Sequence, residues 1–147
     1  MIINSLMLVV EVDDLQRIFS RITGDVDKIR DLRVEFLSDK IVVGGKLSIG
    51  LSIPFKTIWQ ARIMNEGRSA VLTLAGVSVA MVGMGDEMIT SQVLSALAGK
   101  LNGYEAVRVD GKEIIVDLQP ALEAHGITLN AELKRLEITP SGIVLEA

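Results

Sequence analysis

Few residues in this chain have side chains suited to catalysis or metal binding, and those few are scattered. The only histidine, His125, stands at the expected end of a short helix with no other recognisable ligand nearby. A metal site needs several converging ligands, so a surface position or a C-terminal capping role is favoured for this side chain. Asp25 and Asp27 are spaced like the start of a calcium loop. Positions 29 and 30, an isoleucine and an arginine, stand where that loop requires oxygen ligands and a glycine. The sequence therefore predicts no metal site.

Two further patterns are incomplete versions of known motifs. Gly83 and Gly85 precede a predicted helix, as glycines do in phosphate-binding loops, but no third glycine and no Gly-Lys-Ser/Thr sequence follows. The Gly-x-Ser-x-Gly motif of serine hydrolases is absent, and Ser48 and Ser52 are expected on the solvent side of a strand. The acidic pairs at the start of the two predicted helices are explained by a favourable interaction with helix N-termini. The sequence therefore predicts a protein that is not an enzyme and needs no cofactor.

The clearest structural pattern lies between Lys46 and Met64. In its first ten residues apolar side chains alternate with small or polar ones, which is typical of a strand with one apolar face. The apolar members are Leu47, Ile49, Leu51, Ile53 and Phe55. The same phase continues through Trp59. The stretch is predicted as one long bent strand, or as two strands joined near Pro54, which cannot donate a hydrogen bond to a ladder.

The apolar face of this stretch needs a cover. Burying one large apolar side chain stabilises a protein by about 1.5–3 kcal/mol, so a facing helix or a ligand is expected over it. The best candidate is the predicted helix near Asp86 to Lys100, which carries Ile89, Val93 and Leu97 on a wide apolar stripe. Its other face is thinly polar, so much of this helix is expected to be covered.

The remaining patterns predict one more helix and several more strands. Before the stretch, these are a strand or apolar arm at 6–12, a short amphipathic helix capped by Asp13 and ended by Gly24, a strand from Ile29, a turn at 38–40, and a bulge or second turn at Gly44-Gly45. After the stretch, the sequence predicts a hairpin loop at 65–68, a return strand at 71–81 and a helix end at Gly99 to Gly103. A hairpin with a type I′ turn at Asp110-Gly111 and a helical turn from Pro120 follow. The last predicted features are an alternating run at 127–134, a phase slip at Arg135 and a closing hairpin through 139–142. An antiparallel α+β protein follows from this order.

Size and composition narrow the class of protein. With 147 residues the chain fits one domain, so residues 1–147 are expected to form a single domain. Hydrophobic residues make up 49% and the mean hydropathy is +0.42, while aromatic residues make up only 3%. The apolar mass is therefore aliphatic, which suits the lining of a sheet or a groove.

Charge and cysteine content exclude several kinds of partner. The 15 basic and 19 acidic residues give a net charge of −4, and the basic residues are spread along the chain. Phosphate binding needs a concentrated basic face, so neither nucleic acid nor an anionic membrane surface is expected as a partner. The chain has no cysteine and therefore no disulfide.

The N-terminal segment indicates the compartment. Its apolar run lacks the basic region of a signal peptide, and no run in the chain reaches the roughly 20 apolar residues of a membrane span. No integral membrane segment is predicted, and a cytoplasmic location is expected. A chain trimmed of its leader would show the same sequence and would belong in the periplasm or at a membrane surface.

Two interpretations of the apolar faces remain open from the residues alone. From periodicity, the simpler one is that the 46–64 stretch and the helix stripe are two halves of one closed core, with any remaining apolar patch serving self-association. The other is that a sheet curved around the helix leaves a groove for an alkyl chain. High aliphatic content, few large aromatic side chains and the thinly polar helix favour the groove.

The order of elements resembles a known family. The segments that carry the resemblance are the strip Lys46–Ile63, the return strand ending in Val77-Ser78-Val79, the helix near Asp86–Lys100, the hairpin Val107–Val116 and the tail Leu136–Leu145. Over about residues 30 to 147 this pattern resembles the bacterial small lipid-binding proteins of the tubular lipid-binding superfamily. That group includes mycobacterial-type periplasmic lipid-binding domains and, more distantly, bactericidal permeability-increasing and synaptotagmin-like mitochondrial lipid-binding modules.

The resemblance implies a long curved antiparallel sheet wrapped around a helix at about residues 86–101, with a lipid or fatty-acyl ligand between them. It also implies pairing of modules, here as a homodimer, and no catalytic residue. On this basis the sequence predicts non-enzymatic binding of a lipid or another elongated apolar ligand. The predicted ligand-binding residues are Leu47, Ile49, Leu51, Ile53, Phe55, Trp59, Ile89, Val93 and Leu97. The alternative is a structural or protein-interaction module with a closed core and a homo-oligomer interface.

Overall fold

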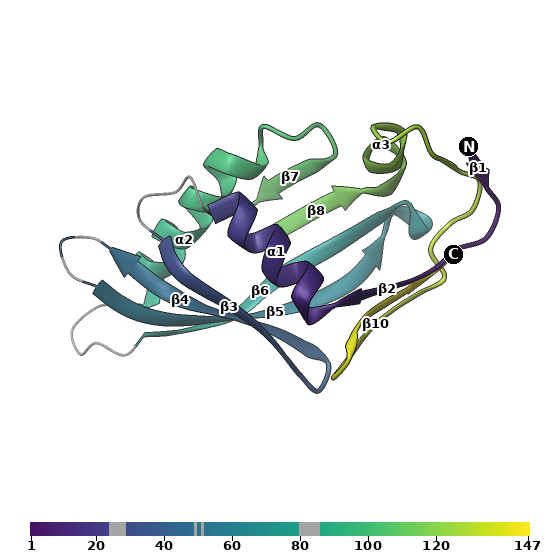
Figure 1. The fold of residues 1–147 in the computed structure, drawn as a ribbon. Helices are drawn as coiled ribbons and strands as arrows, with labels where there is room; N and C mark the ends of the chain where they lie inside the picture. Colours follow the sequence, from purple (N-terminus) through teal and green to yellow (C-terminus); the bar gives the residue numbers. More distant parts are fainter. Residues whose placement is uncertain (24–28, 49, 51, 80–85) are drawn as a thin grey trace.

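The largest element of the fold is a six-stranded antiparallel sheet (Figure 1). The computed structural model describes residues 1–23, 29–48, 50, 52–79 and 86–147. In spatial order, the strands of the sheet are β3 (Ile29–Leu37), β4 (Lys40–Ser48), β5 (Ser52–Met64), β6 (Ser69–Val79), β8 (Glu113–Asp117) and β7 (Val107–Asp110). β3 and β7 therefore form its two edges. The 3-10 turn η1 (Asn65–Gly67) connects β5 to β6, which confirms the predicted hairpin loop.

Two helices pack against the same hydrophobic core. α1 (Val12–Thr23) contacts β3 and α2, and α2 (Asp86–Leu101) contacts β6 and β7. Figure 1 shows α1 lying across the sheet, with α2 beside it. Leu15 and Phe19 of α1 and Leu94 and Leu101 of α2 join the core cluster. The predictions of a short N-terminal amphipathic helix and of a helix over 86–101 are confirmed.

A second, smaller sheet closes one end of the core. Its order is β10 (Arg135–Thr139), β11 (Gly142–Glu146) and β2 (Met7–Glu11), all antiparallel. β10 contacts β5 and β3, and its Ile138 and the Ile143 of β11 belong to the core cluster. A short helix, α3 (Leu118–Glu123), and a parallel pair formed by β1 (Ile2–Ile3) and β9 (Thr128–Leu129) complete the fold. The predicted α+β class with antiparallel sheets is confirmed.

The structure corrects the prediction for the 46–64 stretch. Ser48 pairs with Ser52, and Leu47 pairs with Ile53, so the chain reverses around Gly50. Gly50 has φ +88, a left-handed conformation that glycine adopts without steric cost. The stretch is therefore a hairpin of β4 and β5, neither one bent strand nor a pair joined near Pro54, which lies inside β5.

Other predicted boundaries also shift. Gly44 and Gly45 lie inside β4 with an unbroken register to β5, and the irregularity is in β3 between Arg30 and Arg33. The hairpin of β7 and β8 is confirmed, but its two loop residues are Gly111 and Lys112, and of these only Gly111 has positive φ, so the turn is not type I′.

The helix end at Gly99 and the alternating run at 127–134 also differ from their predictions. Gly99 lies inside α2 rather than at its end. In the alternating run at 127–134, only Thr128 and Leu129 form a strand, and a new strand begins at Arg135. The run was predicted from period-2 alternation alone, but its backbone bonds in turn to Ile3 of β1, to Gly67 of η1 and to Glu146 of β11, so it does not follow one partner strand.

Candidate functional site

The predicted ligand-binding residues with described side chains lie in the core. The exposed fractions of Leu47, Ile53, Phe55 and Trp59 are 0%, 1%, 4% and 3%. Leu47, Phe55 and Trp59 share one cluster with Leu101 of α2. The strip and α2 therefore border the same core, although the strands that α2 contacts are β6 and β7.

The other predicted ligand-binding residues are outside this description. Ile49 and Leu51 lie outside the described residues. Ile89, Val93 and Leu97 are carried by α2, and their side chains lie outside what the structure describes. For these positions the role in ligand binding stays a prediction.

A polar hydrogen-bond chain lies within the buried strip. The Trp59 indole Nε1 donates to Thr57 Oγ1 at 2.7 Å, and the Thr57 hydroxyl donates to the Val43 carbonyl oxygen at 2.9 Å. Thr57 is only 1% exposed. Among the described residues, no buried polar side-chain atom lacks a hydrogen-bond partner. The strip thus satisfies its own polar groups and offers none of them to a ligand.

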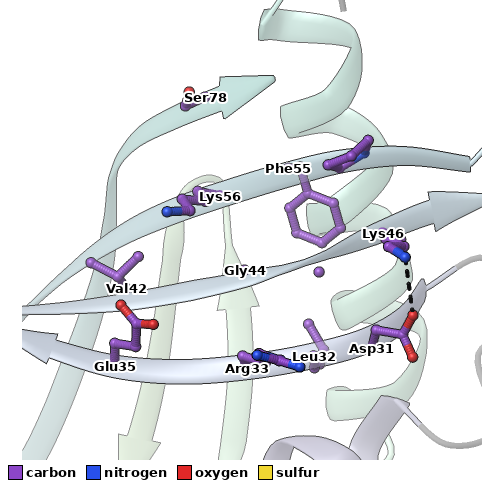
Figure 2. A pocket seen from close by; sticks show the side chains of 12 residues that line it. Asp31, Leu32, Arg33, Glu35, Val42, Gly44, Lys46, Phe55, Lys56 and Ser78 are labelled. Atoms are coloured by element: carbon purple, nitrogen blue, oxygen red, sulfur yellow. Dashed lines mark ion pairs between the residues drawn. The ribbon is translucent and has the colours of Figure 1, made fainter. Parts of the chain in front are cut away.

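A wide hollow of about 730 Å³ lies over β3, β4 and β5 on the face opposite the core (Figure 2). Its lining includes side chains that point away from the buried strip, such as Val42, Pro54 and Lys56. Gly44 has no side chain, and Figure 2 shows Lys56, Arg33 and Lys46 placed around it.

The charges in this outer hollow oppose one another. Arg33, Lys46 and Lys56 stand with Asp31 and Glu35, and Lys46 Nζ lies 3.6 Å from the Asp31 carboxylate. All five side chains belong to exposed residues. A site that selects a small ligand usually combines an apolar wall with a few converging polar groups. The outer hollow has exposed charges of both signs instead, and it is not the best candidate site.

A second hollow lies between α1 and the end of α2, and we call it the α1–α2 hollow. It has a volume of about 500 Å³. The residues that line it are Asp14, Arg17, Ile18, Arg21, Leu101, Tyr104 and Val107. Asp14, Arg17, Ile18 and Arg21 recur at intervals of three and four along α1, so they share one face of that helix.

The apolar part of the α1–α2 hollow is both exposed and continuous with the core. Ile18 is 49% exposed and Tyr104 is 53% exposed, although both are large side chains. Leu101 is 6% exposed and belongs to the core cluster, with Val107 packed against that cluster. The hollow therefore leads from solvent to the layer between the helices and the sheet.

Two arginines give the hollow a basic rim. Arg17 Nη2 lies 2.6 Å from Asp14 Oδ1, and Asp14 Oδ2 accepts a hydrogen bond from the Glu11 backbone N–H at 3.1 Å. Among the described residues, Arg21 has no ion-pair partner. The charge of Arg17 is thus matched by Asp14, whereas Arg21 has no counterion in the described part of the chain.

Asp14 also corrects the predicted start of α1. The helix begins at Val12, so Asp13 lies in its first turn and is not the N-cap. The Asp14 carboxylate reaches back to the N–H of Glu11, which is half of a capping box. This contact fixes the point at which β2 ends and α1 begins.

Sequence reasoning did not select most of the residues around this hollow. Ile18 and Leu101 belong to segments that the sequence predicts as helices, and neither was predicted to bind a ligand. The available signal was the position of Ile18 at the margin of its stripe, next to Arg17 and Arg21. Tyr104 and Val107 had no signal, because only the folded chain brings α1 beside the segment that follows α2.

Neither a metal site nor a membrane-spanning helix is found in the described part of the chain. There, no three His, Asp or Glu side chains gather in a way that could hold a metal ion. His125 is exposed, and its backbone N–H donates to Leu122 at the end of α3. None of the helices in the described ranges has the length and hydropathy needed to cross a membrane.

Comparison of the chain with protein-family models, with curated proteins and with solved structures finds no match in any of the three. The resemblance to tubular lipid-binding proteins consequently stays a prediction from the sequence pattern.

Proposed function

We propose that the protein binds an amphipathic, lipid-like molecule in the α1–α2 hollow, without chemical conversion. One observation carries the proposal: an apolar hollow of about 500 Å³ opens to solvent at Ile18 and Tyr104 and ends at the core residue Leu101. That volume falls within the roughly 300–1,000 Å³ of ordinary ligand sites. A sheet that curves around the helices, as the resemblance implies, belongs to the same proposal.

Desolvation supplies the driving force for the apolar part of the ligand. Ile18 and Tyr104 keep about half of their surface in water, and covering a large apolar side chain is worth about 1.5–3 kcal/mol. The end of an alkyl chain at Leu101 lies against the cluster that contains Leu47 and Trp59. The predicted strip then belongs to the core behind the site and does not itself line the hollow.

The rim favours an anionic head group. Arg21 is exposed in the last turn of α1, and a guanidinium binds a carboxylate or phosphate through paired hydrogen bonds. Asp14 already holds Arg17, so Arg21 is the cation assigned to the head group. A fatty acid satisfies both the apolar hollow and the basic rim.

Uptake of oleate, followed by native mass spectrometry, tests this site. The variant Ile18→Glu places a carboxylate in the apolar hollow, and it is expected to lower oleate affinity at least tenfold. Ile18 is half exposed, so the variant is expected to fold. Leu37→Glu is the matched control, because Leu37 is 59% exposed on β3 and does not line the hollow. Equal uptake by the two variants would move the site elsewhere.

A second comparison separates the head group from the chain. Arg21→Gln is expected to weaken oleate binding several-fold and to leave binding of the neutral oleyl alcohol unchanged. An equal loss for both ligands would mean that Arg21 acts on the fold and not on the head group.

One observation favours the alternative function, a module with a closed core. Leu47, Ile53, Phe55 and Trp59 are at most 4% exposed, so the predicted strip is already covered by protein. Wild-type protein that takes up neither oleate nor oleyl alcohol would support that alternative and end the lipid proposal.

A further inference from the structure

β2 is an open edge of the three-stranded sheet. It pairs with β11 on one side only. Next to the ladder, Leu6 and Ala147 exchange both of their backbone hydrogen bonds, at 2.9 and 2.8 Å. Hydrogen-bonded and non-hydrogen-bonded pairs alternate along an antiparallel ladder. Leu8 and Val10 therefore bond to β11, whereas Met7 and Val9 direct their N–H and C=O groups away from it.

Side chains cover part of each edge of the larger sheet. On β3, the Gln16 side chain donates to the Leu32 carbonyl and accepts the Val34 N–H at 2.8 Å. On β7, Asn102 accepts the Val109 N–H at 3.2 Å. On β2, Asp14 accepts only the N–H of Glu11. Within the described ranges, the outward groups of Met7 and Val9 have no partner.

The side chains of this edge are apolar on both faces. Met7, Leu8 and Val9 are 68%, 44% and 44% exposed. Natural edge strands usually carry charged residues, proline or a bulge, because an open apolar edge recruits another strand. The three central residues of β2 have none of these features. This strand is therefore suited to receive an extended partner strand.

We propose that the partner is a second copy of this chain, joined through antiparallel pairing of β2 with β2 about a twofold axis at Leu8. The two smaller sheets then form one continuous sheet across the dimer. This proposal rests on the edge alone and is independent of ligand binding in the α1–α2 hollow.

Backbone chemistry selects both the partner and the register. With the axis at Leu8, the free groups of Met7 pair with those of Val9 in the other copy, and the reverse pair forms by symmetry. The edge is thus complementary to itself. Glu11 then faces the uncharged Ser5 of the other copy, so no like charges meet. The Glu11 N–H is already held by Asp14. An axis at Leu8 therefore keeps both central pairs of Met7 with Val9 complete and lacks a donor only at the outer positions of Ser5 and Glu11. An axis at Val9 would place Glu11 opposite Met7 and leave only the Val9 pair complete.

Single-cysteine variants test this register, because the chain has no cysteine of its own. In the proposed dimer the two copies of residue 8 form a non-hydrogen-bonded pair with Cα atoms about 4.5 Å apart, which a disulfide can span. Leu8→Cys is expected to give mostly covalent dimer on mild oxidation. The two copies of residue 9 lie diagonally, about 7–8 Å apart, so Val9→Cys is expected to cross-link poorly. Leu37→Cys, exposed on β3, measures random collision.

Each result of this experiment decides the proposal. Cross-linking at residue 8 well above residues 9 and 37 supports it. Preferential cross-linking at residue 9 overturns the register, and equal yields at all three positions overturn the dimer. If the true partner were a strand of another protein, the purified chain would give equal yields at all three positions.

A non-covalent test uses proline. The Val9 N–H faces the open edge, so Val9→Pro removes an outward donor while keeping the bonds between β2 and β11. In sedimentation velocity, wild type is expected to shift toward dimer with concentration and Val9→Pro to remain monomeric. If Val9→Pro unfolds, Val9→Lys provides the same comparison by adding a charge. A wild type that is monomeric at all concentrations, or a variant that dimerises equally, contradicts the proposal.

Discussion

Thr57 connects the only tryptophan of the chain to the backbone of the neighbouring strand. Its hydroxyl accepts from Trp59 Nε1 and donates to the Val43 carbonyl, in a position only 1% exposed. A single polar residue on an apolar strand face usually weakens the core. Here both partners are satisfied, so the hydroxyl fixes the orientation of the indole ring at little cost.

Replacing Thr57 by valine keeps the shape of the side chain and removes both hydrogen bonds. The buried indole N–H then has no acceptor, and the free energy of unfolding is expected to fall by about 1–3 kcal/mol. Urea denaturation with an unchanged m-value measures this loss.

Thr57→Ser is the matched control, because it keeps the hydroxyl and removes one methyl group. It is expected to lose less stability than Thr57→Val. The reverse order would show that packing of the methyl group, and not the hydrogen-bond chain, stabilises this position.

Adjacent glycines in β4 differ in the space around them. A Cβ at Gly45 would lie 2.9 Å from Leu32 Cδ2 and 3.2 Å from Phe55 Cζ, whereas one at Gly44 would lie 3.5 Å or more from its nearest neighbours. The ring of Phe55, the cross-strand partner of Gly45, occupies the place of the missing side chain. Gly45 is therefore required by packing, and Gly44 is not.

Gly45→Ala is expected to lower the free energy of unfolding by about 1–3 kcal/mol, because extra volume forces the core to shift. Gly44→Ala is expected to be neutral or to stabilise by up to about 1 kcal/mol, because it restricts the unfolded chain. Thermal or urea unfolding of the two variants side by side measures the difference. Similar effects at both positions would contradict the packing argument.

At the scale of elements, α1 serves as the missing neighbour of β3. The Gln16 amide imitates a strand, since it donates to Leu32 and accepts from Val34, two residues apart on the same edge. One side chain thus satisfies the edge and sets the position of α1 on the sheet.

Gln16→Ala is expected to expose the Val34 N–H to solvent and to accelerate its hydrogen exchange at least tenfold. The stability loss is expected to be about 1–2 kcal/mol for two partly buried hydrogen bonds. Gln119→Ala serves as control, because the described partner of that amide is the Glu123 carboxylate on the same short helix. Unchanged exchange at Val34 in Gln16→Ala would show that the edge is protected by something other than Gln16.

The hairpin at Gly50 shows why alternation predicts strands better than it predicts turns. Ser48 pairs with Ser52 and Leu47 with Ile53, so residues of equal parity face each other. Odd-numbered side chains then point inward on both strands, and the apolar phase passes through the turn without a break. The sequence pattern predicted a possible junction of two strands near Pro54 instead. Pro54 lies near the start of β5, where its missing N–H is tolerated.

The strands and the two main helices were predictable because each depends on a local period. The candidate site was not, because it depends on contacts between distant segments. Tyr104 and Val107 lie far from Ile18 in the sequence, and only the fold brings them to the same hollow. The sequence contained the apolar residues of the hollow, and only Ile18, beside two arginines, carried a signal that it would stay uncovered.

At the scale of the whole molecule, the aliphatic residues are divided between a shared core and several exposed positions. The core joins both sheets with α1 and α2. Two of the exposed areas are the α1–α2 hollow and the edge of β2, and α1 follows directly from β2. The two proposals therefore concern neighbouring surfaces with different chemistry: a concave site for an alkyl chain and an extended edge for a strand.

The pairing of β2 with β11 also has a consequence for how the protein is made. Residues 7–11 pair with residues 142–146, so β2 is synthesised well before its partner strand. At about 5–20 residues per second, β2 remains without its native neighbour for on the order of ten seconds in the growing chain. During that interval its apolar side chains are open along both edges, and neighbouring nascent chains on one messenger carry the same self-complementary strand. If β2 pairs with β2 as we propose, assembly of two copies is expected to begin during translation, before β11 of either copy has been made.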